Sequence, residues 1–168
     1  LTDYMYNPCI EEIDNEVGRI LDLLDKLEIA EETFVLFTSD NGPALGSTGP
    51  LRGRKNTTYE GGPRVPCVIR WKEHLPAGKT IDEITGTMDL LPTFARLAGA
   101  SLPQDRVIDG SDLWPLLKGK KGAKSPHESF PYFHQGKLEA VRYRSWKLHL
   151  DSENNPVELY NLKDDIGE

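Results

Sequence analysis

The 168-residue sequence has no long hydrophobic run and no excess of basic residues. No apolar segment approaches the roughly 20 residues that a membrane-spanning helix needs, so no membrane contact is predicted. The formal net charge of −7 argues against a nucleic-acid partner, which would need a basic face. With 38% hydrophobic and 28% charged residues, the composition is that of a globular protein, which excludes a disordered chain.

Cysteine and histidine are also scarce. The two cysteines, Cys9 and Cys67, form no spacing motif, so neither a disulfide framework nor a cysteine-based metal cluster is predicted. Cys67 lies within VPCVIRW, and we expect it to be a small core residue. His74, His127 and His149 are expected at structural or surface positions.

The two ends of the sequence lack the features of a complete chain. It starts with Leu1 rather than Met, and it leads straight into polar sequence without a visible signal peptide. It ends on LKDDIGE, which has neither a helix cap nor a polar tail. We therefore expect a fragment of a longer protein.

Hydrophobic periodicity predicts an amphipathic helix over residues 7–28. Asn7 suits the N-cap, and Pro8 suits the first helical position. Apolar residues recur every three or four positions and gather on one face: Ile10, Ile13, Val17, Ile20, Leu21, Leu24 and Leu27.

The segments after this helix alternate between strand and helix patterns. TFVLF and VPCVIRW are short, β-rich runs typical of buried strands, and TMDLLPTFARLA (87–98) predicts a helix that stops at Gly99. From Val141 onward, apolar and polar residues alternate as in a half-solvated antiparallel strand. We place a boundary near residue 122, with an α/β portion over 1–122 and a small antiparallel subdomain over 123–168.

The loop over residues 38–62 begins with chemistry suited to a hard cation. Asp40 and Asn41 directly follow a predicted strand, and Gly42 permits a sharp turn there. Adjacent carboxylate and amide oxygens favour calcium or magnesium, and zinc is disfavoured because neither Cys nor His is nearby. A plain turn is the alternative, since these residue types are also standard in turns.

The same loop continues with a cationic cluster between glycines. Arg52, Arg54 and Lys55 lie within four positions of one another, and the glycines allow the backbone to approach a ligand closely. A metal-binding pair followed by such a cluster suits a tetrahedral oxyanion such as phosphate or sulfate. Solvated surface charge is the alternative.

The sequence resembles the latter part of a sulfatase, in the alkaline phosphatase superfamily. The resemblance is carried by ordered blocks that run almost end to end: TFVLFTSDNG, GPLRGRKNTTYEGGPRVP, TGTMDLLPTFARLAGA, DGSDLWPLL and EAVRYRSWKLHL…VELYNLKDDIGE. It implies an α/β fold: a partial alkaline-phosphatase-like sheet with flanking helices, plus a small antiparallel C-terminal sheet. It also implies hydrolysis of a sulfate monoester.

The resemblance assigns roles to three residues of the loop. Asp40 and Asn41 would be two protein ligands of a divalent metal, calcium with magnesium as the alternative. Lys55 would be the catalytic residue that contacts the sulfate of the substrate and the leaving oxygen. His134 follows an aromatic pair and is a further substrate-binding candidate, with a structural position as its alternative.

The sequence also departs from the family pattern. Members carry a Cys-x-Pro-x-Arg or Ser-x-Pro-x-Arg motif whose first residue becomes the formylglycine nucleophile. Neither cysteine fits it, SLPQDR from Ser101 misses by one residue, and TGPLR begins with Thr48. We therefore expect the nucleophile in a missing upstream part and no sulfate-ester hydrolysis by this chain alone.

Two other functions stay open at this point. One is a phosphoryl hydrolase of the same superfamily, whose oxyanion pocket needs similar charges. The other is a non-catalytic module that binds a ligand or associates with itself through surface that missing sheet neighbours would cover. A periplasmic, lysosomal or secreted location is implied only by the family resemblance.

Overall fold

A computed structural model describes residues 3–168, with side chains from residue 6 onward. The chain forms two compact units, one made of residues up to 73 together with 131–168, and the other of residues 74–130. These compact units differ from the two portions expected from the sequence. The boundary near residue 122, between an α/β portion and an antiparallel subdomain, stays a prediction.

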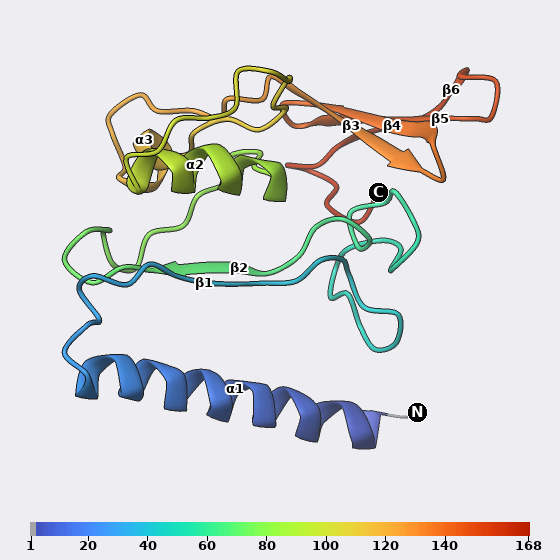
Figure 1. Cartoon of the computed structure of the whole chain (residues 1–168). Helices are drawn as coiled ribbons and strands as arrows, with labels where there is room; N and C mark the ends of the chain where they lie inside the picture. The colour runs from blue at the N-terminus through green and yellow to red at the C-terminus, as the bar shows by residue number, and fades with distance from the viewer. Residues whose placement is uncertain (1–2) are drawn as a thin grey trace. The chain divides into compact units, whose positions relative to one another are not determined.

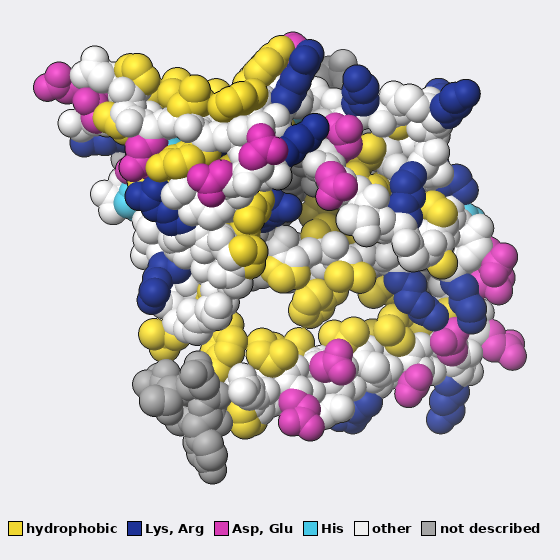
Figure 2. Space-filling view, turned by 180° about the vertical axis from the view of Figure 1, so that it is seen from behind, with side chains coloured by type: hydrophobic (Ala, Val, Ile, Leu, Met, Phe, Trp, Pro, Cys, Tyr) yellow, Lys and Arg dark blue, Asp and Glu magenta, His cyan; other side chains and the backbone are white. Residues whose placement is uncertain are grey.

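The first helix, α1, spans Asp3–Lys26. It therefore begins earlier than predicted, and Asn7 and Pro8 lie inside it rather than at its start. The proline signal was misleading because Pro has a helical φ angle and, this near the N-terminus, removes only one backbone hydrogen bond. Figure 2 shows hydrophobic side chains gathered along one side of α1, and several are exposed: Ile10, Ile13, Ile20, Leu23 and Leu27.

Two short strands form the first sheet. β1 (Val35–Thr38) pairs antiparallel with β2 (Cys67–Arg70), and Thr38 lies opposite Cys67. The intervening segment, residues 39–66, is thus a long loop whose two ends meet at one end of the strand pair (Figure 1). Cys67 is exposed, so the expectation of a core position is wrong: in β2 both Cys67 and Val68 face solvent.

The C-terminal sheet is a four-stranded antiparallel meander, as predicted. Its strands follow chain order: β3 (Ser129–His134), β4 (Lys137–Tyr143), β5 (Trp146–Leu150) and β6 (Pro156–Asn161). The Gln135–Gly136 turn between β3 and β4 has positive φ angles of 50° and 78°, the geometry of a tight two-residue hairpin. In β5 the alternation buries Lys147 and His149 and exposes Trp146.

Residues 74–130 hold three short helical elements. The predicted helix is confirmed as η1 (Thr87–Asp89) followed by α2 (Leu90–Leu97), with Gly99 at a positive φ of 66° after its end, and α3 spans Trp114–Leu117. Asp89 is fully buried and joins three segments. Its carboxylate accepts hydrogen bonds from the backbone of Gly86 and Ser111, both at 2.8 Å, and lies 2.7 Å from His127 Nε2.

Among residues 3–168, no helix is both long and apolar enough to cross a bilayer.

Candidate functional site

The 39–66 loop folds back on itself through backbone hydrogen bonds. The N–H of Gly42 donates to the carbonyl of Gly62 at 2.6 Å, and the N–H of Gly61 donates to that of Arg52 at 2.7 Å. A third bond, 3.1 Å long, runs from the N–H of Lys55 to the carbonyl of Pro43. These bonds bring the backbone of Lys55 beside the segment that follows Asn41.

Glycine is required where two backbone segments of this loop come into contact. A Cβ atom added to Gly42 would lie 1.8 Å from the carbonyl oxygen of Gly61, and one added to Gly62 would lie 2.0 Å from that of Thr57. Gly53 has a positive φ of 78°, which disfavours other residues. These glycines therefore determine the shape of the loop.

Asp40 and Asn41 lie directly after β1. The side-chain amide of Asn41 donates to Oδ2 of Asp40, so the two side chains lie against each other. The Ser39 hydroxyl donates to the backbone carbonyl of Asn41 at 3.0 Å and braces the turn. The oxygen donors suit a hard cation, but calcium takes six to eight oxygens, so two residues form only part of a shell.

Among residues 3–168, no group of three His, Cys, Asp or Glu side chains is placed to hold a metal ion.

The cations of the loop divide into two kinds. Arg52 donates to Glu158 at 3.3 Å, to the Tyr160 hydroxyl at 3.0 Å and to the backbone carbonyl of Glu168 at 2.9 Å. Arg64 lies 3.5 Å from Glu60. Both are thus engaged within the protein, which the sequence did not reveal.

Lys55 and Arg54 differ from these two arginines. Both are exposed, and in the described part of the chain their side chains have no hydrogen-bond or ion-pair partner. The backbone N–H of Lys55 also donates to the carbonyl of Pro43, on the opposite segment of the loop. An uncommitted ammonium group is what the proposed sulfate-binding role requires.

A buried ionic network fastens this loop to the C-terminal sheet. Lys147 is 0% exposed, and its ammonium lies 2.9 Å from Glu60 and 3.0 Å from Glu168. Glu60 is 1% exposed, and Arg142 lies 3.7 Å from its other oxygen. His149 lies 2.9 Å from the same Glu168 oxygen that contacts Lys147.

The pKa of Glu168 reflects this network. Burial by itself would raise the pKa, but hydrogen bonds from His149, the Glu60 backbone and Lys147 outweigh it and hold the pKa below its ordinary value. Burial also raises the pKa of the Tyr132 phenol, whose ring faces the Lys147 ammonium at 4.6 Å. The network therefore stabilises charged Glu168 inside the protein.

A second junction surrounds Tyr59. Its hydroxyl donates to Glu158 at 2.9 Å, and this bond, together with Arg52, lowers the pKa of Glu158. The guanidinium of Arg52 lies 3.9 Å from the centre of the Tyr59 ring, and the His149 ring stacks on it at 4.4 Å. The Tyr59 ring thus contacts both Arg52 and His149.

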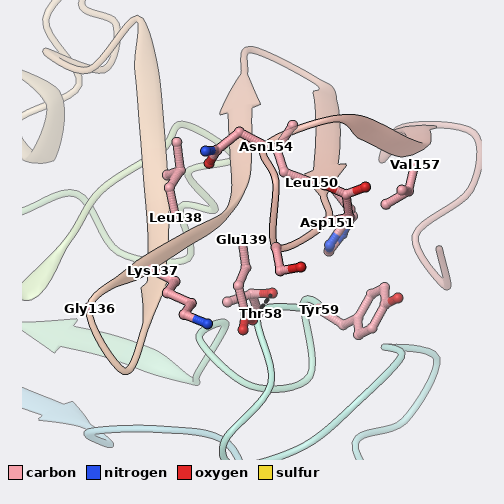
Figure 3. Close-up of a pocket in the computed structure, with 12 residues that line it drawn as sticks. Thr58, Tyr59, Gly136, Lys137, Leu138, Glu139, Leu150, Asp151, Asn154 and Val157 are labelled. Atoms are coloured by element: carbon pink, nitrogen blue, oxygen red, sulfur yellow. Dashed lines mark hydrogen bonds between the residues drawn. The ribbon is translucent and has the colours of Figure 1, made fainter.

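A cavity of about 510 Å³ lies between the loop and the C-terminal sheet (Figure 3). It is lined by residues of three segments: Thr58 and Tyr59; Gly136, Lys137, Leu138 and Glu139; and His149, Leu150, Asp151, Ser152, Asn154 and Val157. His134 does not line the cavity. Its Nδ1 lies 3.1 Å from Oε1 of Glu139, which is a lining residue. Asp40, Asn41 and Lys55 do not line it either.

Comparison with known proteins shows the family. The Sulfatase family model matches residues 5–100, and the model of the N-sulphoglucosamine sulphohydrolase C-terminal region matches residues 54–168. Together they cover almost the whole chain. The chain therefore belongs to the sulfatase family and corresponds to a C-terminal region of it, which confirms the resemblance.

Curated relatives agree with this assignment. Human steryl-sulfatase is 43% identical over 171 residues, which cover 91% of this chain and 29% of the relative. Dog N-acetylgalactosamine-6-sulfatase is 42% identical over 162 residues, which cover 92% of this chain and 30% of the relative. The chain thus spans about a third of the length of the relatives that it matches.

Solved structures show the same fold. Ps i-CgsB, crystallised in complex with k-i-k-neocarrahexaose, superposes with a TM-score of 0.81 at 33% identity. The match covers 93% of this chain and 36% of that protein. The partial α/β fold with an antiparallel C-terminal sheet is therefore confirmed.

Proposed function

We propose that this chain is part of a sulfuric ester hydrolase and contributes part of its metal and sulfate site. Asp40 and Asn41 supply oxygen ligands to calcium, with magnesium as the alternative ion, and the Lys55 ammonium contacts the sulfate group. The observation that carries this proposal is the hydrogen bond from the Lys55 backbone to Pro43, beside the acid–amide turn.

The side-chain chemistry of the three residues suits a sulfate monoester. The relatives are named for a sterol and a sugar sulfate, so the sulfate ester is what their names share. Oxygen ligands hold a hard cation, and an ammonium group neutralises the negative charge that develops on the leaving oxygen. Formylglycine, expected in a part of the protein outside these 168 residues, would supply an oxygen nucleophile.

The proposed site is incomplete within these 168 residues. Asp40 and Asn41 offer too few oxygens to bind calcium tightly, and without a nucleophile there is no covalent step to accelerate. The proposal therefore includes that the chain alone does not hydrolyse sulfate esters. Turnover of p-nitrocatechol sulfate by the purified chain with calcium would contradict this point.

The enzymatic role is tested in the longer protein that the proposal implies. Replacing Lys55 with Ala should lower kcat on p-nitrocatechol sulfate by roughly 10²–10³-fold, as expected for the loss of one charge-stabilising donor. Lys163→Ala is the matched control, because Lys163 is exposed after β6, outside the loop. Unchanged kcat in Lys55→Ala would reject the role of Lys55.

The phosphoryl hydrolase alternative is separated by the same assay. A sulfatase should turn over p-nitrocatechol sulfate much faster than p-nitrophenyl phosphate, whereas a phosphoryl hydrolase should reverse this order. The upstream nucleophile gives a second criterion: a Cys or Ser in the oxidation motif favours sulfate, and an unmodified Thr or Ser favours phosphate.

A further inference from the structure

We propose that the cavity between the loop and the C-terminal sheet is a subsite for an uncharged, hydroxyl-rich ring, such as one sugar unit of an oligosaccharide. This inference rests on the proposed function, because it gives the sulfate ester a neighbouring group to be recognised. The cavity volume of about 510 Å³ lies within the range of small-molecule sites.

The polar lining of the cavity is fixed in place. Glu139 accepts a hydrogen bond from the Thr58 hydroxyl at 3.1 Å and is braced on its other oxygen by His134. Asp151 is held by the backbone N–H groups of Glu153 and Asn155, at 2.8 and 2.9 Å. Pre-positioned carboxylates of this kind are good acceptors for ring hydroxyl groups.

Donors in the lining remain available to a ligand. Within the described residues, neither the ammonium of Lys137 nor the side-chain amide of Asn154 has a hydrogen-bond partner. Figure 3 shows the Lys137 side chain directed toward Glu139 and Thr58. A ligand that both accepts and donates hydrogen bonds would satisfy Lys137 and Glu139 together.

The lining disfavours planar aromatic ligands and apolar ligands. The Tyr59 ring is already in contact with the Arg52 guanidinium and stacks with the His149 ring. A nucleobase or a planar aromatic ring would therefore compete with these existing contacts. The apolar lining is limited to Leu138, Leu150 and Val157, which is too little to enclose a rigid apolar ring system.

The charge and position of the cavity favour an uncharged unit next to the sulfated one. Two carboxylates, Glu139 and Asp151, and one ammonium, Lys137, leave the lining slightly negative, so a second anionic group gains little there. Thr58 follows Lys55 by three residues, so their Cα atoms lie at most about 11 Å apart. A linked sugar unit can span that distance.

The test is a ¹H–¹⁵N NMR titration of the 168-residue chain with methyl β-D-galactopyranoside, an uncharged sugar ring. We expect shifts of the amides of residues 136–139 and 149–154. Lys137→Ala and Glu139→Gln should each weaken this binding about tenfold, the effect of losing one hydrogen bond to a charged group. Glu139→Gln keeps an acceptor for Thr58, and the spectrum of each variant reports whether it is folded.

Two controls separate this inference from the proposed function. Lys163→Ala and Lys55→Ala should both leave galactoside binding unchanged, because neither residue lines the cavity. An absence of shifts in the two segments would overturn the subsite, as would preferential binding there of estrone sulfate, a rigid apolar ring system. Inorganic sulfate titrated in parallel tests Lys55, so either proposal can fail while the other stands.

Discussion

Lys147 is the residue on which the loop and the C-terminal sheet both depend. Its ammonium is removed from water and lies between the carboxylates of Glu60 and Glu168. A charge buried in this way is tolerated only when it is paired, and removal of one partner leaves the others uncompensated. Removing one member of the network therefore destabilises the fold, whatever the net contribution of the intact network to stability.

Replacing Lys147 with Met should lower the free energy of unfolding by about 3–5 kcal/mol, because Glu60 and Glu168 would remain buried without the ammonium group that both contact. Urea denaturation followed by circular dichroism measures this loss. Lys163→Met, at an exposed position, should change stability by less than about 0.5 kcal/mol. Equal effects of the two substitutions would show that the network does not hold the sheet to the loop.

Glu158 gives the junction a dependence on pH. Hydrogen bonds from Tyr59 and Arg52 hold its pKa below the ordinary value of 4.5, so charged Glu158 stabilises the folded chain above that pH. This stability should be lost as the pH falls through the lowered pKa of the folded state. Thermal unfolding at a series of acidic pH values should show the decline.

The Glu158→Gln variant isolates that contribution. It should be less stable than the parent at neutral pH and should lose less stability on acidification. Glu153→Gln, an exposed carboxylate in the turn before β6, should retain the parent pH profile. Parallel acid profiles for the parent and Glu158→Gln would contradict the assignment.

Local sequence was sufficient to propose Asp40, Asn41 and Lys55, because their chemistry is compressed into one loop. It could not show that Glu60 pairs with Lys147, since the partners are far apart in the chain and a lysine in an alternating strand suggests a solvated face. The buried side of β5 also carries His149, which the pattern alone placed only as structural.

Close backbone contacts determine the shape of the 39–66 loop. The pairing of β1 with β2 holds its two ends together, and the glycines allow its backbone segments to come into contact. Short apolar runs and turn residues were enough to predict both strands. Their antiparallel pairing was not predicted, because it depends on contacts between segments separated by the whole loop.

The glycine contacts predict opposite effects for two matched substitutions. Gly42→Ala should destabilise the chain by about 1–3 kcal/mol, because the new methyl group collides with the Gly61 carbonyl. Gly18→Ala should stabilise it by about 0.5–1 kcal/mol, since Gly18 lies within α1 and the added carbon would meet no atom within 4 Å beyond its chain neighbours and the backbone of its own helix. Chemical denaturation distinguishes these outcomes, and stabilisation by Gly42→Ala would refute the packing of the loop.

The whole molecule exposes apolar surface on α1 and on the β1–β2 pair. Ile13 and Ile20 of α1 are 47% and 55% exposed, and Phe37 and Val68 of the strand pair are 42% and 61% exposed. Exposed apolar side chains of this kind favour association. The self-association expected from the sequence therefore stays a prediction with a defined surface.

We expect the chain to form oligomers whose mass rises with concentration, measured by size-exclusion chromatography with light scattering. Ile20→Glu should shift the distribution toward monomer by placing a charge on the apolar side of α1. Asn15→Glu adds the same charge at an exposed polar position of the helix and should have little effect. A monomeric parent chain at every concentration would exclude this association.

We propose that Asp40, Asn41 and Lys55 form one side of a cation-assisted sulfate site. Its most direct test is an NMR titration of the chain with inorganic sulfate in the presence of calcium. We predict weak binding that shifts the amides of all three residues and is lost in Lys55→Ala. Shifts that avoid these residues, or that persist unchanged in Lys55→Ala, would show that the three residues do not form a sulfate site.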